Sequence, residues 1–248
     1  MRSRTGDAVR VLAVSPHLDD AAFSVGGTLA ALADAGHEVT VVTCFTASVP
    51  DPAGFALACQ LDKGLPADVD YLALRRAEDA AAMAVLGARP VYLGLPEAPH
   101  RGYTSAADLF AGVHPGDDVE RSLTAALDGY DADLWMAPQA LGGHVDHRQV
   151  LRAVAPLDRP VLWWRDSPYV LRDPLAVAGP ELPDGLAEVC LPQDLDRRAD
   201  ACACYPTQLG FQFGGVEEMR TALAGLPEVL LAGDRAREVL ATAAVPAG

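Results

Sequence analysis

Two clusters of histidine and aspartate stand out in the sequence. The first is Pro16-His17-Leu18-Asp19-Asp20, and the second is Gly142-Gly143-His144-Val145-Asp146-His147. In the first cluster, a His followed three residues later by an Asp can supply two ligands to one metal ion, and Asp19 is left free to accept a proton from a metal-bound water. The second cluster holds two imidazoles and a carboxylate within four residues, behind paired glycines that let the backbone approach a ligand.

Each cluster also has an interpretation without chemistry. An Asp at the start of a helix is commonly an N-cap, and the second cluster alone could be a solvated polar loop with a capping Asp. Taken together, the clusters favour a metal site, because two His and one Asp make a three-ligand zinc set with one position open for water. The remaining Asp19, His144 and Asp146 would then be a base, an acid and an orienting carboxylate.

The elements around the first cluster predict a βαβ unit. Val9–Ser15 is a nearly continuous apolar run, which is typical of a parallel strand buried on both faces. The Ala- and Leu-rich stretch Ala21–Ala35, followed by Gly36, is typical of a helix with a glycine cap. Val39–Phe45 predicts a second strand. The first cluster therefore follows a strand, at the carboxyl edge where open α/β sheets bind ligands.

The alternation of strands and helices continues. Further helices are expected at Leu72–Leu86, Val119–Leu127 and His147–Ala155, and further strands at Val91–Leu93, Leu134–Ala137 and Val161–Trp164. The predicted fold class is α/β: a Rossmann-like, doubly wound and mostly parallel sheet with helices on both faces. We expect residues 1–166 to form this catalytic core, and residues 167–248 to form a small C-terminal extension packed on it within the same domain. The second cluster follows the strand Leu134–Ala137, so both clusters should lie on one edge.

Length and composition are those of an enzyme-sized globular domain. The 248 residues include 34 Asp and Glu against 19 Lys and Arg, a formal net charge of −15, and half of them are hydrophobic. This acidic balance argues against nucleic acid and anionic membranes as partners. No apolar run approaches the roughly 18 residues of a membrane helix, and no signal peptide is recognised, so a cytoplasmic protein is expected. Five cysteines without a Cys-x-x-Cys pair predict neither a disulfide framework nor a thiolate zinc site.

Short motifs along nearly the whole chain resemble those of the PIG-L/LmbE-like family of zinc-dependent N-acetylglucosamine de-N-acetylases. The specific ones are the metal motifs Ser15-Pro16-His17-Leu18-Asp19-Asp20 and His144-Val145-Asp146-His147. The accompanying ones are Gly26-Gly27-Thr28-Leu29, Arg75-Arg76-Ala77-Glu78, Leu93-Gly94-Leu95-Pro96 and Tyr205-Pro206-Thr207-Gln208.

The resemblance implies a role for each matching residue. The implied roles are His17, Asp20 and His147 as zinc ligands, Asp19 as general base, His144 as acid or oxyanion-stabilising group, Asp146 as its orienting partner, and Arg75 as a substrate contact. Two departures concern substrate contacts and not the metal site. Ala21 stands where an acidic residue often follows the Asp pair, and Glu97 stands where many members have Asp.

Two long intervals, Thr46–Tyr71 and Pro96–Asp118, exceed ordinary connections, and such loops at strand carboxyl ends usually belong to the site. The second contains a segment dense in hydrogen-bonding groups, from Glu97 to Tyr103, which we expect to form a substrate wall. Its candidate substrate contacts are Glu97, His100 and Arg101. After the fifth strand, Arg165 or Asp166 could also reach the site.

These observations predict a zinc-dependent hydrolase that removes an N-acyl group, most simply acetyl, from an amino sugar or a glycosylated small metabolite. Asp19 would take a proton from water, and His144, held by Asp146, would stabilise the oxyanion or protonate the leaving amine. One alternative is a metal-dependent phosphoesterase with two divalent ions. Another is an inactive, metal-stabilised binding relative, which is disfavoured because neither Asp19 nor His144 is needed to hold a metal. The expected partner is a small molecule, and the resemblance favours self-association into a homo-oligomer.

Overall fold

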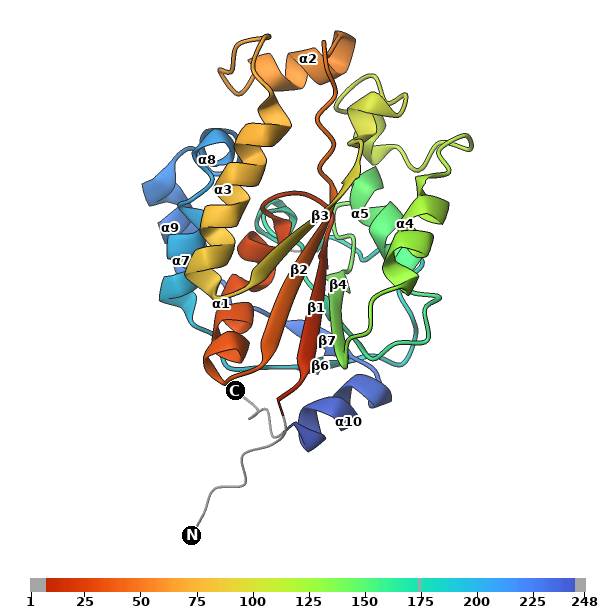
Figure 1. The fold of residues 1–248 in the computed structure, drawn as a ribbon, viewed down its shortest axis with the longest axis vertical. Helices are drawn as coiled ribbons and strands as arrows, with labels where there is room; N and C mark the ends of the chain where they lie inside the picture. The colour runs from red at the N-terminus through yellow and green to blue at the C-terminus, as the bar shows by residue number, and fades with distance from the viewer. Residues whose placement is uncertain (1–7, 174, 244–248) are drawn as a thin grey trace.

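The computed structural model describes residues 8–173 and 175–243, which are built around one seven-stranded sheet (Figure 1). The strand order is β3-β2-β1-β4-β5-β7-β6. Five strands are parallel: β1 (Arg10–Ser15), β2 (Glu38–Phe45), β3 (Arg89–Leu95), β4 (Leu134–Pro138) and β5 (Val161–Trp164). Strand β7 (Leu230–Ala232) is antiparallel to β5, and β6 (Ala187–Val189) is antiparallel to β7. The predicted mostly parallel α/β sheet is confirmed.

Helices cover both faces of the sheet (Figure 1). One face carries α1 (Asp20–Asp34), α3 (Tyr71–Leu86), α7 (Leu195–Cys202) and α9 (Val216–Ala224), and the other carries α4 (Val119–Asp128) and α5 (Val145–Val154). Side chains of the buried strand β1 alternate between two cores: Val11 and Ala13 pack on the α1 side, and Leu12 and Val14 pack on the α5 side. This explains why the strand reads as a continuous apolar run.

The remaining helices are short. They are α2 (Gly54–Leu61), the 3₁₀ turns η1 (Ala98–His100) and η2 (Asp108–Phe110), α6 (Tyr169–Arg172), α8 (Pro206–Gln212) and α10 (Asp234–Thr242). Figure 1 shows α2 beyond the carboxyl ends of the central strands. Within the described ranges, no helix combines the length and apolar character needed to cross a bilayer. All five cysteines are free, as predicted.

The structure differs from the expected elements at several points. Helix α2 lies inside Thr46–Tyr71, which was expected to be a long loop, and the third strand is longer than Val91–Leu93. Strands β6 and β7 have three residues each, too few for a periodic pattern, and both come after residue 166 yet join the main sheet. The division of the chain at residue 166 stays a prediction.

Helix α1 breaks at Val25, whose φ and ψ are −142° and 18°. The break leaves backbone N–H groups without helical acceptors, and the carboxylate of Glu228 accepts two of them, from Gly27 at 2.7 Å and from Thr28 at 2.6 Å. Glu228 also accepts the hydroxyl of Thr28 at 2.6 Å. A side chain at Gly27 would not fit, because its Cβ would lie 2.9 Å from the carbonyl oxygen of Asp194. The Gly-Gly-Thr motif is thus the point where α1 contacts Asp194 and Glu228 of the C-terminal part of the chain.

Arg198 of α7 completes this junction. Its Nε lies 3.3 Å from the Glu228 carboxylate and donates at 3.2 Å to the carbonyl oxygen of Phe23, before the break. Arg198 and Glu228 are both almost fully buried. Removing one partner of a buried, hydrogen-bonded ion pair leaves the other charge uncompensated, which is strongly destabilising.

We expect Glu228→Ala to lower the free energy of unfolding by about 3–5 kcal/mol, because it leaves the buried charge of Arg198 without a carboxylate and two backbone N–H groups without an acceptor. Urea unfolding followed by circular dichroism measures this. The matched control is Glu120→Ala, which breaks the more exposed ion pair with Arg152 and should cost no more than about 1 kcal/mol. Equal losses in the two variants would contradict the assigned role of Glu228.

Two of the motifs noted in the sequence contact each other. On α3, Glu78 accepts hydrogen bonds from the backbone N–H and hydroxyl of Thr207, at 2.9 and 2.6 Å. Asp79 of the same helix accepts the hydroxyl of Tyr205 at 2.8 Å. These contacts fasten the start of α8 to α3, which positions α8 beside the carboxyl edge of the sheet.

Candidate active site

Both His/Asp clusters lie at the carboxyl edge of the sheet, as expected. The first follows β1 and the second follows β4, and these two strands are hydrogen-bonded neighbours. Asp20 begins α1, while His144 is the N-cap of α5. Two segments more than 120 residues apart in the chain therefore meet at one point.

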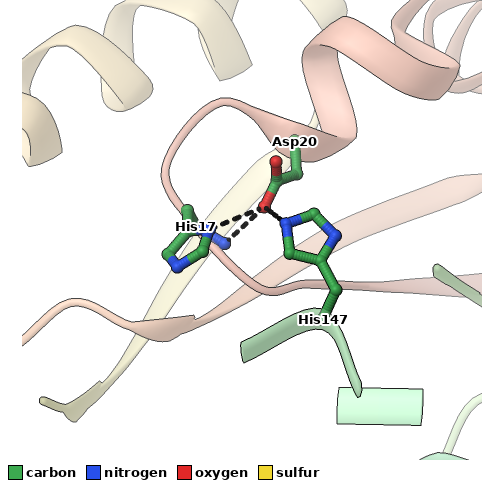
Figure 2. Close-up of side chains that lie close together, drawn as sticks. All are labelled: His17, Asp20 and His147. Carbon is green, nitrogen blue, oxygen red and sulfur yellow. Dashed lines mark hydrogen bonds and ion pairs between the residues drawn. The ribbon is translucent and has the colours of Figure 1, made fainter. Parts of the chain in front are cut away.

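Three side chains form a candidate metal centre: His17, Asp20 and His147. Nδ1 of His17 and Nε2 of His147 lie 3.2 and 3.3 Å from the same carboxylate oxygen of Asp20 (Figure 2). The ligand atoms all lie within 4.8 Å of one another. Nε2 of His147 is buried and, apart from the contact with Asp20, has no hydrogen-bond partner among the described residues, as expected of an atom that binds a cation. Two imidazoles and one carboxylate suit zinc, with a coordination position left open.

A carboxylate holds the far nitrogen of each histidine ring. Asp146 Oδ2 lies 2.9 Å from Nε2 of His17, and Asp166 Oδ1 lies 2.6 Å from Nδ1 of His147. When each carboxylate accepts the proton of the ring nitrogen beside it, the nitrogen that faces Asp20 is free to bind a metal. His17 therefore presents Nδ1 to the candidate metal centre, whereas His147 presents Nε2. Asp166 had only been noted as a residue that could reach the site.

The carboxylate of Asp146 contacts other groups than the one expected. It was predicted to orient His144, but its oxygens instead bind His17, the backbone N–H of Ala98 at 3.1 Å and the guanidinium of Arg101 at 2.7 Å. Helix α5 begins at Val145, so Asp146 lies in its first turn and its side chain reaches the loop after β1. Its link to the His144 ring is through its backbone N–H.

A hydrogen bond from the backbone of Asp146 defines the tautomer of neutral His144. Its Nδ1 accepts the backbone N–H of Asp146 at 3.2 Å, so the ring hydrogen resides on Nε2. Burial lowers the pKa of His144 to about 3, against the opposing effect of the Asp146 carboxylate. His144 is therefore a neutral hydrogen-bond donor near pH 7. This favours the oxyanion-stabilising role over the acid.

Asp19 lies beside the candidate metal centre and outside its ligand set. Its Oδ1 is 3.1 Å from Nη2 of Arg75, whose Nη1 donates to Glu97 at 2.8 Å. Burial raises the pKa of Asp19 to about 6, assisted by the charge of Asp20 and opposed by Arg75. A buried carboxylate with a raised pKa is suited to accept and return a proton near neutral pH.

A cavity of about 290 Å³ opens onto these groups. Its walls come from α2, from the η1 and η2 segment, and from α6 and α8, so both long intervals border it. Of the residues predicted from the sequence, the cavity lining includes His17, Asp19, Asp20, Arg75, Glu97, His100, His144 and Asp146. His147 lies beneath this lining and is fully buried.

Arg101 does not lie where the predicted substrate contact would have to be. It does not belong to the cavity lining. Its guanidinium donates to the carboxylates of Asp117 and Asp146 and to the carbonyl oxygen of Pro96, so four of its five N–H donors are used by the protein. The loop turns Arg101 inward because two buried carboxylates attract it there.

Comparisons with known proteins agree with this geometry. The model of the PIG-L family, described as GlcNAc-PI de-N-acetylase, matches residues 12–157. The chain is 36% identical over 171 residues to 2'-N-acetylparomamine deacetylase of Streptomyces fradiae, covering 64% of this chain and 57% of that protein. It is 33% identical over 187 residues to 1D-myo-inositol 2-acetamido-2-deoxy-alpha-D-glucopyranoside deacetylase of Corynebacterium glutamicum, covering 71% of this chain and 62% of that protein.

A solved structure is similar over almost the whole chain. It is that of Dbv21, the deacetylase of the A40926 pseudoaglycone, with a TM-score of 0.71 and 29% identity, covering 91% of this chain and 97% of that one. The chain spans less than two thirds of the length of the curated relatives, but the family match includes both His/Asp clusters. The chain therefore belongs to the PIG-L family.

Proposed function

We propose that this protein is a zinc-dependent hydrolase that removes an N-acetyl group from an amino sugar or a glycosylated small metabolite. One observation carries the proposal: a three-ligand set with a coordination position left open lies beside a buried carboxylate that is not one of the ligands. His17, Asp20 and His147 surround one point, while Asp19 lines the same cavity without belonging to that set. Membership of the PIG-L family and three similar proteins named as deacetylases support it.

The proposed ligands of the metal are His17, Asp20 and His147. Zinc bound there would supply a Lewis acid for the amide carbonyl and would acidify water at neutral pH. Asp19 accepts a proton from the attacking water, whose oxygen forms a bond to the acetyl carbon. The same carboxyl then returns the proton to the nitrogen as the C–N bond breaks, and the products are acetate and a free amine.

The other side chains position these groups. Arg75 holds Asp19 from one side, and Glu97 holds Arg75. His144 donates a hydrogen bond from Nε2 to the carbonyl oxygen as negative charge develops there. A neutral imidazole can do this without losing its proton. Asp146 and Asp166 fix the rings of His17 and His147.

The two alternatives fit the site less well. A phosphoesterase with two metal ions would need a second set of ligands, and among the described residues the other candidate group is His17, His144 and Asp146. That group shares His17, and its carboxylate is already neutralised by Arg101. An inactive binding relative would need neither Asp19 nor the donor nitrogen of His144.

A product assay distinguishes these functions. The zinc-loaded protein is incubated with a panel of N-acetylglucosaminides and N-acetylated pseudodisaccharides, and with phosphate monoesters of the same sugars. We expect amine and acetate to appear in equal amounts, with no phosphate release. Phosphate release without amine would instead support the phosphoesterase, and neither product from a fully metal-loaded protein would support the binding relative.

We expect Arg101→Met to weaken zinc binding by about 10–100-fold, because Arg101 holds the carboxylate that orients His17. Competition with a chromogenic chelator measures the dissociation constant. Arg152→Met is the matched control, since Arg152 makes an ion pair with Glu120 at the surface. The role assigned to Arg101 is wrong if both variants bind zinc like the native protein.

A further inference from the structure

The single lysine of the chain lies against the cavity. Lys63 follows α2, is half-buried and lines the cavity. Its Nζ donates to the carbonyl oxygen of Cys59 at 3.0 Å. The same atom lies 5.4 Å from the ring centroid of Tyr71 and 5.1 Å from that of Phe211. Within the described part of the chain, no carboxylate oxygen lies within 4.0 Å of it.

This environment only partly replaces the water that Lys63 has lost. An ammonium has three donors, and one neutral carbonyl uses one of them. The two rings add cation–π attraction, worth about 0.5–2 kcal/mol. Burial, together with the charge of Arg75, lowers the pKa of Lys63. In a chain with 34 acidic residues, the lack of an acidic partner points to a ligand that supplies one.

A second cation, the exposed Arg172, lies at the same end of α8 and pairs with no carboxylate in the described ranges. Arg172 of α6 lines the cavity, donates through Nη2 to Oε1 of Gln212 at 2.5 Å, and lies 5.9 Å from the ring centroid of Tyr169. Phe211 and Gln212 are consecutive, so Lys63 and Arg172 meet the last turn of α8 through adjacent residues.

The other arginine of the cavity wall is not available in this way. Arg75 is already paired with Asp19 and Glu97. Asp62 also lines the cavity, but it is exposed and forms no ion pair with Lys63. The free positive charge of the cavity is therefore concentrated where α2 and α6 approach the end of α8.

We infer that Lys63 and Arg172 form a subsite that binds a carboxylate of the substrate, at a distance from the acetamide. A carboxylate has one charge and two acceptor oxygens, which matches one ammonium and one guanidinium on different walls. Phe211, which is 61% exposed, offers an apolar surface beside it for the group that carries the carboxylate. This inference rests on the proposed function, since it makes the substrate an anionic N-acetylated glycoside.

The test uses two aryl glycosides of N-acetylglucosamine that differ in one group, 4-carboxyphenyl and its neutral isostere 4-carbamoylphenyl. Calorimetry measures the dissociation constant of each with the zinc-loaded protein. We expect the acid to bind about 10-fold or more tightly than the amide, as charge-assisted hydrogen bonds provide. Lys63→Met should remove most of this preference, Arg172→Gln should reduce it, and Lys63→Arg should keep it.

Two further variants separate binding from structure. Phe211→Leu removes the ring contact between Lys63 and α8 but keeps the ammonium, so the preference for the acid should survive. Arg121→Gln removes one exposed positive charge on α4, outside the cavity lining, and should leave the preference unchanged. A preference lost equally in Arg121→Gln and Lys63→Met would reflect net charge alone and would overturn the subsite.

The subsite and the proposed function fail in different ways. Equal affinity for acid and amide in the native protein, or no binding of either, overturns the subsite. Amine release from the neutral amide, measured in the same samples, tests the deacetylase by itself. Deacetylation of both glycosides without a preference removes only the subsite, while preferential binding of the acid without amine release from either removes only the proposed deacetylase.

Discussion

Asp19→Asn will lower kcat by roughly 10²–10⁴-fold while the protein keeps its full complement of metal. The side chain is 5% exposed and lies outside the group formed by His17, Asp20 and His147. Asparagine has nearly the same shape, but it cannot accept a proton from water. Arg75 retains Glu97 as a partner in the variant, so we expect the fold to persist.

The measurement combines rates of amine release with elemental analysis of the same samples. Asp68→Asn is the matched control, because it makes the same chemical change at an exposed position outside the cavity lining. Near-normal turnover by a metal-loaded Asp19→Asn would show that Asp19 is not the base. Loss of the metal together with turnover would instead make Asp19 a ligand or an essential support of one.

His147→Ala will reduce zinc content to a small fraction of one ion per chain and reduce activity by about 10³-fold or more, because the metal supplies several kcal/mol of transition-state stabilisation. The imidazole is fully buried, and alanine offers no ligand atom, so only His17 and Asp20 of the proposed set would remain. The variant should also lose the stabilisation that zinc confers on the native protein, which amounts to about 2.7 kcal/mol at a concentration 100 times Kd.

Elemental analysis and thermal unfolding with and without added zinc measure both effects. His37→Ala is a suitable control, because His37 lies before β2, away from the candidate metal centre. Treating the native protein with a chelator should reproduce the behaviour of His147→Ala, and adding zinc should restore only the native protein. Equal zinc content and equal thermal shifts in the native protein and His147→Ala would remove His147 from the ligand set.

The sequence by itself determined the five parallel strands of the sheet and the neighbourhood of the two clusters. Strands β1 and β2 and helix α1 were predicted to within about two residues, because their apolar periodicity is local. His17 and Asp20 lie where the loop after β1 enters α1, and His144 and His147 lie at the start of α5. Since parallel strands end at one edge, placement of both pairs on that edge required only that β1 and β4 belong to the same sheet, and their contact also required that the two strands be neighbours.

Only the tertiary structure decided which carboxylate serves which histidine. Asp146 binds His17 across 129 positions, Asp166 binds His147 across 19, and Arg101 binds Asp146 across 45. Such partners depend on the direction in which each side chain leaves its helix or loop and on which buried charges must be neutralised. Neither quantity appears in a local pattern, so Arg101 looked like a substrate contact in the sequence and is a buried support in the structure.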